Sequence, residues 1–285
     1  MEVLVEHVGS SRTIGVTGSP GVGKSTLVAA LVGAYRDAGS RVGVLAVDPS
    51  SPFTGGAVLG DRVRMQEHAT DSGVFIRSMA SRGHLGGLSW ATPQALRVLD
   101  AAGFDIVVIE TVGVGQSEVE VAGLADSTVV VLAPGLGDGI QAAKAGILEV
   151  SDVFVVNKAD REGANQVVRD LTAMLRSAAA VPSAQSEGWT PPVLRTQAHQ
   201  AEGIDALVSA LAEHADWLVT SGRLARRRRR QAREEIEALA QVSLVEAAHT
   251  VLGSAGVDAL ADEVVAGRLD PYAAADLLVD AVRGA

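Results

Sequence analysis

Residues 18–25 read Gly-Ser-Pro-Gly-Val-Gly-Lys-Ser, which is the full G-x-x-x-x-G-K-[ST] pattern. The octapeptide stands between an aliphatic run, Thr13–Thr17, and an amphipathic stretch that begins at Ser25, so it joins an expected strand to an expected helix. In that context glycines let backbone N–H groups curl around phosphates, and the start of the helix adds positive charge. A glycine-rich turn with a chance lysine is the alternative, and the flanking strand and helix make it the weaker one. The motif therefore predicts a phosphate-binding loop at the carboxyl end of a strand.

The side chains of this loop predict a nucleotide bound together with Mg²⁺. Lys24 is expected to reach the β- and γ-phosphates, and the hydroxyl of Ser25 is expected to ligate the metal ion. The other residues expected to contact the nucleotide here are Gly21, Val22, Gly23 and Thr26.

Short aliphatic runs alternate with amphipathic segments from Thr13 to about Leu218. This alternation is typical of βαβ units with right-handed crossovers and a parallel sheet. We therefore predict an α/β fold, a P-loop NTPase of the SIMIBI class with a mostly parallel sheet flanked by helices. The predicted strands are Thr13–Thr17, Arg41–Val47, Val74–Met79, Phe104–Glu110, Ser127–Ala133, Asp152–Val156 and Val193–Thr196, and the predicted helices include Ser25–Ala38, Trp90–Ala102, Gly139–Val150 and Gln166–Ala178.

Two acidic residues, Glu110 and Asp48, stand at the carboxyl ends of predicted strands that are expected to lie beside the P-loop. The run Phe104–Glu110 delivers Glu110 to the edge of the sheet where ligands bind in such folds, and Asp48 ends the run Arg41–Val47 at the same edge. Carboxylates there can hold Mg²⁺ or its waters, so we predict Ser25, Asp48 and Glu110 as the metal set. Gly113, three residues after Glu110, can approach the γ-phosphate with its backbone N–H.

Residues 157–160, Asn-Lys-Ala-Asp, follow the strand Asp152–Val156 and select the base. The carboxylate of Asp160 can accept hydrogen bonds from both N1–H and the exocyclic amine of guanine, a donor pair that adenine lacks. Asn157 is expected to hold the loop and touch the base, while the stem of Lys158 covers its face. Gln197 and Ala198, after the last strand, are expected to offer a backbone contact to the guanine oxygen. The predicted ligand is therefore GTP or GDP, and the predicted reaction is hydrolysis of GTP.

The residue after Gly113 affects the expected rate of GTP hydrolysis. Many regulatory GTPases place a glutamine there to orient the attacking water, whereas this chain has Val114, which cannot donate or accept with its side chain. Gln116 is offset, and the arginines Arg62, Arg64, Arg77 and Arg82 are only candidates for an internal finger. We expect slow intrinsic hydrolysis that a partner stimulates.

The pattern changes after Gly222, where the strand signal ends. Arg223 to about Val251 reads as one long helix, followed by shorter ones near Val257–Ala266 and Pro271–Arg283, with Pro271 in a first turn that tolerates it. The predicted organisation is a short lead over residues 1–12, a P-loop GTPase domain over 13–221 and a helical appendage over 222–285. The arginines at 226–230 are interpreted as a solvated helix face with i,i+4 partners such as Arg230–Glu234.

Composition narrows the class of partner. The net charge of −10 argues against general affinity for nucleic acid or an anionic membrane, and no apolar run reaches the ~20 residues of a membrane span. The chain has no cysteine and its six histidines are scattered, which disfavours a thiolate or histidine metal store. The first nine residues lack a basic leader. The expected location is the cytoplasm.

Several longer stretches resemble the MeaB/ArgK family of GTPases, which includes the human protein linked to methylmalonic aciduria type A. The stretches at 47–52 (Val-Asp-Pro-Ser-Ser-Pro) and 137–147 carry the resemblance with far more specificity than the P-loop. The others are Gly15–Thr26, Arg82–Leu88, Glu110–Glu118 and Asp152–Asp160, so the resemblance covers nearly the whole chain.

The resemblance implies a chaperone of an adenosylcobalamin-dependent acyl-CoA mutase, typically methylmalonyl-CoA mutase, that gates cofactor loading and protects the mutase. It assigns Lys24, Asp61 and Glu110 to phosphate binding, metal binding and hydrolysis, and it implies homodimers formed through the helical appendage. It also places Asp138, Gln141 and Lys144 in a switch that relays nucleotide state to the mutase. The chain departs from the family at Gly139, where aspartate is common, at Gln197, where serine is common, at His84, and in its short N-terminal lead.

Two other functions share this fold. A nickel- or zinc-insertion GTPase usually carries cysteine or histidine clusters, which this chain lacks. An amino-acid transport kinase, a label also attached to the family, would need a protein substrate with a phospho-acceptor, and equal binding of ATP and GTP would favour it.

Overall fold

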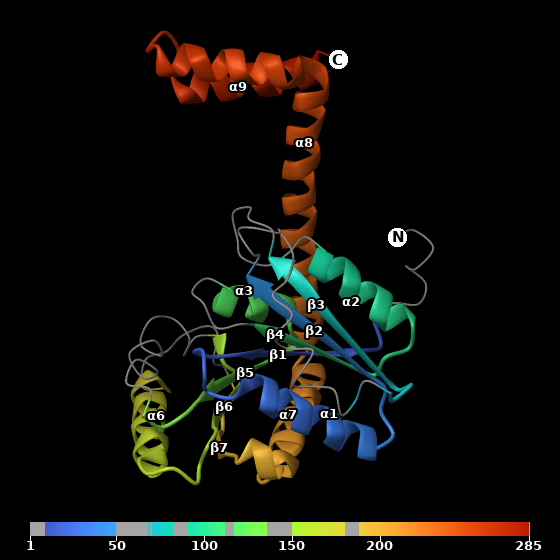
Figure 1. Ribbon diagram of the computed structural model, residues 1–285, viewed down its shortest axis with the longest axis vertical. Coiled ribbons are helices and arrows are strands. Elements are labelled where there is room, and N and C mark those ends of the chain that lie inside the picture. Colours follow the sequence, from blue (N-terminus) through green and yellow to red (C-terminus); the bar gives the residue numbers. More distant parts are fainter. Residues whose placement is uncertain are drawn as a thin grey trace. The chain divides into compact units, whose positions relative to one another are not determined.

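The computed structural model describes residues 9–49, 68, 70–81, 91–111, 117–135, 150–179 and 188–284. Seven strands form one sheet in the order β3-β2-β4-β1-β5-β6-β7, and every strand pair is parallel (Figure 1). The α/β class and the parallel sheet predicted from the sequence are confirmed. The strands are β1 Arg12–Thr17, β2 Val42–Pro49, β3 Val74–Ser81, β4 Ile106–Thr111, β5 Ser127–Leu132, β6 Val153–Val156 and β7 Val193–Arg195.

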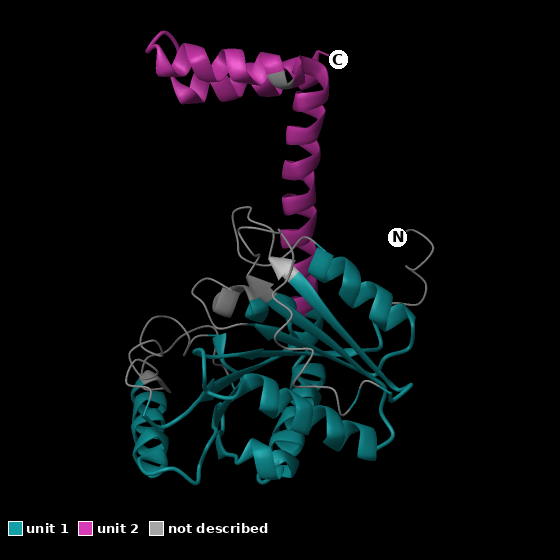
Figure 2. Ribbon diagram, viewed as in Figure 1, with its two compact units in different colours: residues 1–225 teal, residues 226–285 magenta. Residues whose placement is uncertain are grey.

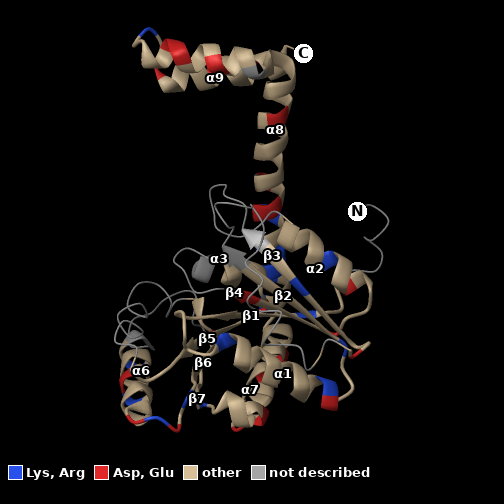
Figure 3. Cartoon of the chain, in the orientation of Figure 1, with Lys and Arg blue, Asp and Glu red and all other residues tan. Residues whose placement is uncertain are grey.

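Helices cover both faces of the sheet. One face packs against α1 (Lys24–Asp37) and α7 (Ile204–Thr220), and the other packs against α2 (Ala91–Ala101), α3 (Ser117–Leu124) and α6 (Ala164–Ala179). Figure 1 shows α2 and α3 above the sheet and α1 and α7 below it. The alternation within β4 explains the two cores, because Val108 points to the α1 side and Val107 to the α2 side. The strands β5 and β6 carry no charged residue (Figure 3), as expected for strands buried on both faces.

Each of the seven strands begins or ends one or two residues away from the boundary predicted from the sequence. Phe104 was expected in a strand, but its N–H donates to Leu99 O and closes the turn after α2, so β4 begins at Ile106. Strand β7 ends at Arg195 rather than at Thr196. The helices α3 and α7 were not among the segments named from the sequence. Of the predicted helix Gly139–Val150, only Val150 lies within the described residues.

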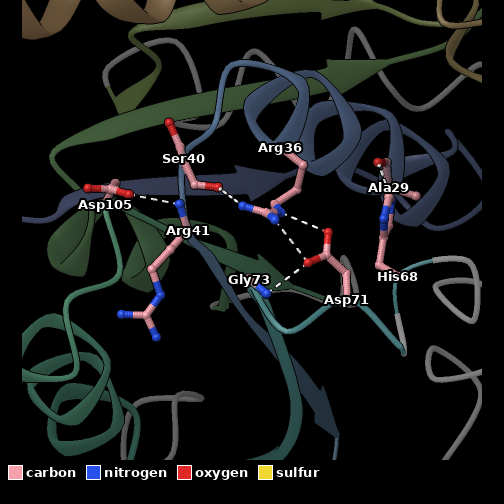
Figure 4. A network of polar contacts seen from close by, with 8 residues as sticks. All are labelled: Ala29, Arg36, Ser40, Arg41, His68, Asp71, Gly73 and Asp105. Atoms are coloured by element: carbon pink, nitrogen blue, oxygen red, sulfur yellow. Dashed lines mark hydrogen bonds and ion pairs between the residues drawn. The ribbon is translucent and has the colours of Figure 1, made fainter.

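A polar network joins α1 to the turn that precedes β3 (Figure 4). Arg36, in the last turn of α1, donates from Nε and Nη2 to the two carboxylate oxygens of Asp71 at 2.8 and 2.9 Å. The same carboxylate accepts from the N–H of Gly73 at 2.8 Å, and the ring of His68 contacts Ala29 O at 3.1 Å. The hydrogen bond from Arg36 holds the pKa of Asp71 below its usual range. This network fixes the start of the β2–β3 pairing against α1.

Asp100, near the end of α2, binds the backbone at the start of the described chain. Its carboxylate accepts a close hydrogen bond from Gly9 N, another from Ser11 N at 2.8 Å, and two from Ser10 at 3.2 Å. Burial acts to raise the pKa of Asp100, but these hydrogen bonds outweigh it and the pKa lies below its usual range. The carboxylate therefore ties residues 9–11 to the end of α2.

We expect Asp100→Ala to lower the free energy of unfolding by about 1–3 kcal/mol at pH 7, because the amides of Gly9 and Ser11 lose a charged acceptor. The folded pKa lies below the unfolded value of about 4, so this stabilisation is complete above pH ~4 and is lost as pH falls through the folded pKa. Urea unfolding of the wild type and the variant between pH 7 and about pH 3 measures the effect. The difference between their free energies of unfolding should shrink as the pH falls. The exposed residue Asp37 offers a control, since Asp37→Ala should change stability by less than about 0.5 kcal/mol. A gap that is independent of pH would rule out the charge of Asp100 as its source.

The chain divides into two compact units, residues 1–225 and 226–285 (Figure 2). The second unit contains most of α8 (Arg223–Val265) and all of α9 (Pro271–Arg283). Gly253 has non-helical backbone angles and divides α8, which gives the expected three helical stretches with a break two residues beyond the expected one. Asp270 caps α9 by accepting from Tyr272 N and Ala273 N. No helix in the described part of the chain is both long enough and apolar enough for a membrane span.

The expected solvated face of α8 is present. Arg230 pairs with Glu234 at 3.7 Å, and one turn farther along Arg233 pairs with Glu237 at 2.8 Å. All four side chains are more than half exposed. Such solvent-exposed ion pairs contribute little to the stability of the fold.

Candidate nucleotide site

The P-loop leaves the carboxyl end of β1 and enters α1 without a side-chain cap. Gly23 stands at the helix start with φ +97°, a left-handed conformation that favours glycine. A Cβ at position 18 would overlap the carbonyl oxygen of Val131 on β5, and a Cβ at position 23 would lie 2.5 Å from Asn157 Nδ2. The loop is therefore packed against β5 and against the segment predicted to bind the base. Gly21 has open space beside it, as a loop that receives a ligand requires.

Lys24 lies at the centre of this loop. Its side chain is 6% exposed, and Nζ donates to Gly18 O at 2.6 Å and to Ser19 O at 3.1 Å. The ammonium group is thus held inside the ring of backbone carbonyls, where phosphate oxygens of a nucleotide would be stronger acceptors. Thr26 follows on the first turn of α1 and is exposed.

Ser25 and Glu110 come together although 85 residues separate them. Ser25 Oγ donates to Glu110 Oε1 at 2.7 Å, and both side chains are buried. Strand register explains the contact, because Glu110 pairs with Val16 of β1 and with Ala46 of β2. The backbone of Asp48 reaches the same edge at the end of β2, while its side chain lies outside the described residues. A hydroxyl and a carboxylate are hard oxygen donors, so the chemistry of this pair fits Mg²⁺, and the two side chains could serve as two of its ligands. Across the described residues, no three His, Cys, Asp or Glu side chains gather as a metal cluster.

A pair of buried hydroxyls beside this site was not anticipated from the sequence. Thr111 Oγ1, directly after Glu110, donates to Thr17 Oγ1, directly before the P-loop, at 3.1 Å. Both threonines are fully buried. The available signal was that each is the polar residue that ends an aliphatic strand, and that neighbouring parallel strands end at one edge. The bond ties the P-loop to the segment that carries Glu110.

Asn157 connects three segments of the site. Its Nδ2 donates to Val22 O of the P-loop at 3.0 Å. Its Oδ1 accepts from Thr196 Oγ1 and from Ala198 N, each at 3.1 Å. The loop-holding role expected of Asn157 is therefore visible in its contacts. The N–H of Ala198, expected at the guanine oxygen, is bonded to Asn157 here.

Lys158 bridges to the P-loop from the other side. It has φ +56°, and its Nζ donates to Gly21 O at 2.6 Å. This contact places the lysine side chain against the P-loop. That its stem covers the base stays a prediction. The following N–H, of Ala159, donates to Thr196 O at 3.0 Å. Asp160 is exposed at the end of this turn.

Gln197, the other residue expected near the guanine oxygen, lies within the described residues, and its N–H donates to Glu202 O at 3.0 Å. The remaining predicted site residues lie outside the described part of the chain. They are Asp61, Gly113 and the three switch residues Asp138, Gln141 and Lys144, together with Val114, Gln116 and three of the four candidate arginines, Arg62, Arg64 and Arg82. The fourth candidate, Arg77, is exposed on β3, a strand at the edge of the sheet.

Known proteins share both the sequence and the fold. The family model described as "Methylmalonyl Co-A mutase-associated GTPase MeaB" matches residues 1–252. A putative GTPase of Pyrococcus horikoshii is 46% identical over 276 residues, covering 97% of this chain and 86% of that protein. "Methylmalonic aciduria type A homolog, mitochondrial" of Mus musculus is 37% identical over 272 residues, covering 95% of this chain and 65% of that protein.

Among solved structures, "Crystal structure of LAO/AO transport system kinase" superposes with a TM-score of 0.71 at 28% identity, covering 99% of this chain and 85% of that one. The agreement therefore extends over the P-loop, the sheet and the site segments described above. The chain belongs to the MeaB family of methylmalonyl Co-A mutase-associated GTPases, and it is a guanine-nucleotide-binding P-loop GTPase.

Proposed function

We propose that this GTPase is a chaperone of an adenosylcobalamin-dependent acyl-CoA mutase of the methylmalonyl-CoA mutase type, gating cofactor loading and protecting the mutase. The observation that carries the proposal is the match of residues 1–252 to a family described by its association with that mutase. The mouse relative, whose name refers to methylmalonic aciduria, supports the same client.

The proposed chemistry begins with GTP and Mg²⁺ at the P-loop. Lys24 binds the β- and γ-phosphates after leaving the carbonyls of Gly18 and Ser19. Ser25 and Glu110, already in contact, would hold Mg²⁺ together with Asp48, and a bound ion would supply positive charge beside the phosphates. The backbone N–H groups of the loop and of Gly113 bind phosphate oxygens. Asp61 is proposed to act in hydrolysis together with Lys24 and Glu110.

Base selection is assigned to the turn at 157–160. Asn157 and Lys158 are held against the P-loop by the bonds to Val22 O and Gly21 O, so base and phosphate sites are one connected unit. Asp160, exposed at the end of the turn, accepts from the two guanine donors. This arrangement favours GTP over ATP.

Slow turnover and a partner response belong to the same proposal. Val114 leaves the position after Gly113 without a group that orients water, so the client mutase is proposed to stimulate hydrolysis. Asp138, Gln141 and Lys144 are proposed to relay the nucleotide state to it.

We also propose a homodimer through the helical unit. Several apolar side chains of α8 and α9 are exposed, among them Val265 at 87% and Tyr272 at 85%, and α9 buries none of its described residues. Exposed apolar surface of this kind is typical of an interface. The exposed apolar residues are Ile236, Leu239, Leu244, Val245, Val251, Val265, Tyr272, Leu277 and Val279.

A second candidate, a nucleotide-dependent protein kinase, is favoured only by the name of the related transport-system-kinase structure. It requires transfer of the γ-phosphate to a protein hydroxyl. Incubation with γ-labelled GTP or ATP and a transport-protein substrate would reveal a labelled protein. The mutase proposal instead expects label in inorganic phosphate alone, with GTP preferred.

The test is GTP turnover by the purified protein, alone and with candidate cobalamin-dependent mutases. We expect a low basal rate of GTP hydrolysis that rises several-fold with one mutase, because the client is proposed to supply the water-orienting group that Val114 cannot provide. In the Lys24→Ala variant both the basal and the mutase-stimulated hydrolysis of GTP should be lost. A fast basal rate that no mutase alters would leave the GTPase standing and remove the chaperone proposal.

A further inference from the structure

The backbone after β7 closes into a short hairpin. Gln197 N donates to Glu202 O at 3.0 Å, and Glu202 N donates to Gln197 O at 3.3 Å, which pairs the two residues in an antiparallel bridge. A single helical turn, Ala198–Gln200, lies between them. The hairpin leads directly into α7, which packs on the sheet.

The side chains of Gln197 and Glu202 form a further hydrogen bond across the hairpin. Gln197 Nε2 donates a close hydrogen bond to Glu202 Oε2. The amide supplies two donors and the carboxylate only acceptors, so the pair is chemically complementary. Glu202 is exposed, whereas Ala198 inside the hairpin is 5% exposed and belongs to the core of the α1 side.

The hairpin contacts the residues that select the base. Ala198 N donates to Asn157 Oδ1 at 3.1 Å, and Thr196 O, one residue before the hairpin, accepts from Ala159 N at 3.0 Å. Asn157 in turn holds Val22 O of the P-loop. The hairpin is therefore linked to the turn at 157–160 by the hydrogen bond from Ala198 to Asn157, and the second hydrogen bond of Asn157 extends this link to the P-loop.

We propose that Gln197 and Glu202 form a side-chain latch that pre-organises the guanine-binding loop, so both are positioning residues for nucleotide affinity. The inference rests on the proposed binding of guanine by Asn157 and Asp160. A loop that is already closed loses less conformational freedom when the nucleotide binds, and its affinity is higher for that reason. The latch acts on GTP and GDP alike, because it touches neither phosphate nor metal residues.

The test compares Gln197→Ser, too short to reach the carboxylate, and Glu202→Ala with Glu202→Gln, whose amide oxygen still accepts from Gln197. The first two should raise the Kd of fluorescently labelled GDP and GTP about three- to tenfold, the range of one net hydrogen bond, mainly through faster dissociation. KM for GTP should rise more than kcat falls. Glu202→Gln should restore affinity, and the double variant Gln197→Ser/Glu202→Ala should be no weaker than either single one.

Gln200→Ala serves as a matched control, because it removes an exposed glutamine from the same hairpin without touching Glu202. Unchanged Kd values in Gln197→Ser and Glu202→Ala, or an equal loss in Gln200→Ala, would overturn the latch. The binding of guanine itself is judged separately, from competition of GTP against ATP in the wild type. If the wild type prefers guanine and the latch variants bind nucleotide normally, only the latch is refuted. If the wild type shows no preference for guanine, the proposed base site is refuted.

Discussion

Lys24→Ala should reduce kcat/KM for GTP by about 10²–10³-fold, the loss typical of one preorganised donor at a developing charge. The buried ammonium is held 2.6 Å from Gly18 O inside the loop, so alanine leaves the phosphates without their one mobile cation in the P-loop. Single-turnover hydrolysis of radiolabelled GTP measures the loss directly. Binding of GDP should also weaken, because Lys24 is proposed to contact the β-phosphate in the ground state as well.

Two controls separate chemistry from folding in this experiment. Arg169→Ala removes an exposed positive charge from α6 and should leave turnover unchanged. Thermal melting should place Lys24→Ala within a few degrees of the wild type, since the loop carbonyls can be solvated. Turnover that stays within tenfold of the wild type in Lys24→Ala would contradict the assignment of this loop as the phosphate site.

Asp160→Asn should exchange guanine selectivity for xanthine selectivity. Guanine offers N1–H and an exocyclic amine to a carboxylate, whereas xanthine carries an oxygen in place of the amine and requires a donor there. The asparagine amide supplies that donor. We expect the affinity for GTP to fall about 10²-fold and that for XTP to rise. Guanine loses the charge and the second acceptor of the carboxylate, whereas for xanthine the amide oxygen of asparagine accepts from N1–H and its N–H donates to the C2 oxygen.

Competition of GTP, XTP and ATP against labelled GDP measures the exchange. The matched control is Glu162→Gln, which neutralises another exposed carboxylate two residues away and should leave base selection as it is. If Asp160→Asn binds GTP as the wild type does, the turn at 157–160 does not select the base. Hydrolysis of XTP by the variant at a rate near that of GTP by the wild type would show that the phosphate site is undisturbed.

Much of the architecture could be predicted from local pattern. All seven strands were expected from aliphatic runs, and the parallel sheet from their alternation with helices. The helix after the P-loop, the Arg230–Glu234 pair and Pro271 in the first turn of α9 also depend on neighbours only a few residues away. Phe104 shows the limit of this reasoning, because an apolar residue beside a strand can serve the preceding turn just as well.

Individual contacts within the site could not be predicted in the same way. The P-loop motif identified Ser25 and the end of a strand identified Glu110, but their 2.7 Å contact depends on β4 lying between β1 and β2. The order of strands is not encoded in the periodicity of any one of them. Thr17 and Thr111 escaped notice for this reason, since each looks like an ordinary strand residue until the two strands are adjacent.

His214 illustrates the same division between local and tertiary information, near the start of β5 and away from the P-loop edge of the sheet. In the sequence it is one of six scattered histidines. In the folded chain it is fully buried, its Nδ1 lies 2.8 Å from Ser127 Oγ, and its ring stacks on Trp217. Ser127 lies 87 residues before His214 in the chain, so no local sequence pattern could identify it as the partner of His214.

The sequence alone determined the class of fold and the family, and it located the P-loop motif and the turn that is proposed to select the base. Each of these is written in contiguous residues, whose conformation follows from short-range sterics and hydrophobic periodicity. Only the tertiary structure decided that Asn157 joins the P-loop to the hairpin at 197–202 and that Gln197 bonds Glu202 there. Those contacts depend on which strands become neighbours and on how the loops at their ends pack, and both are settled by the burial of the whole sheet between its helices.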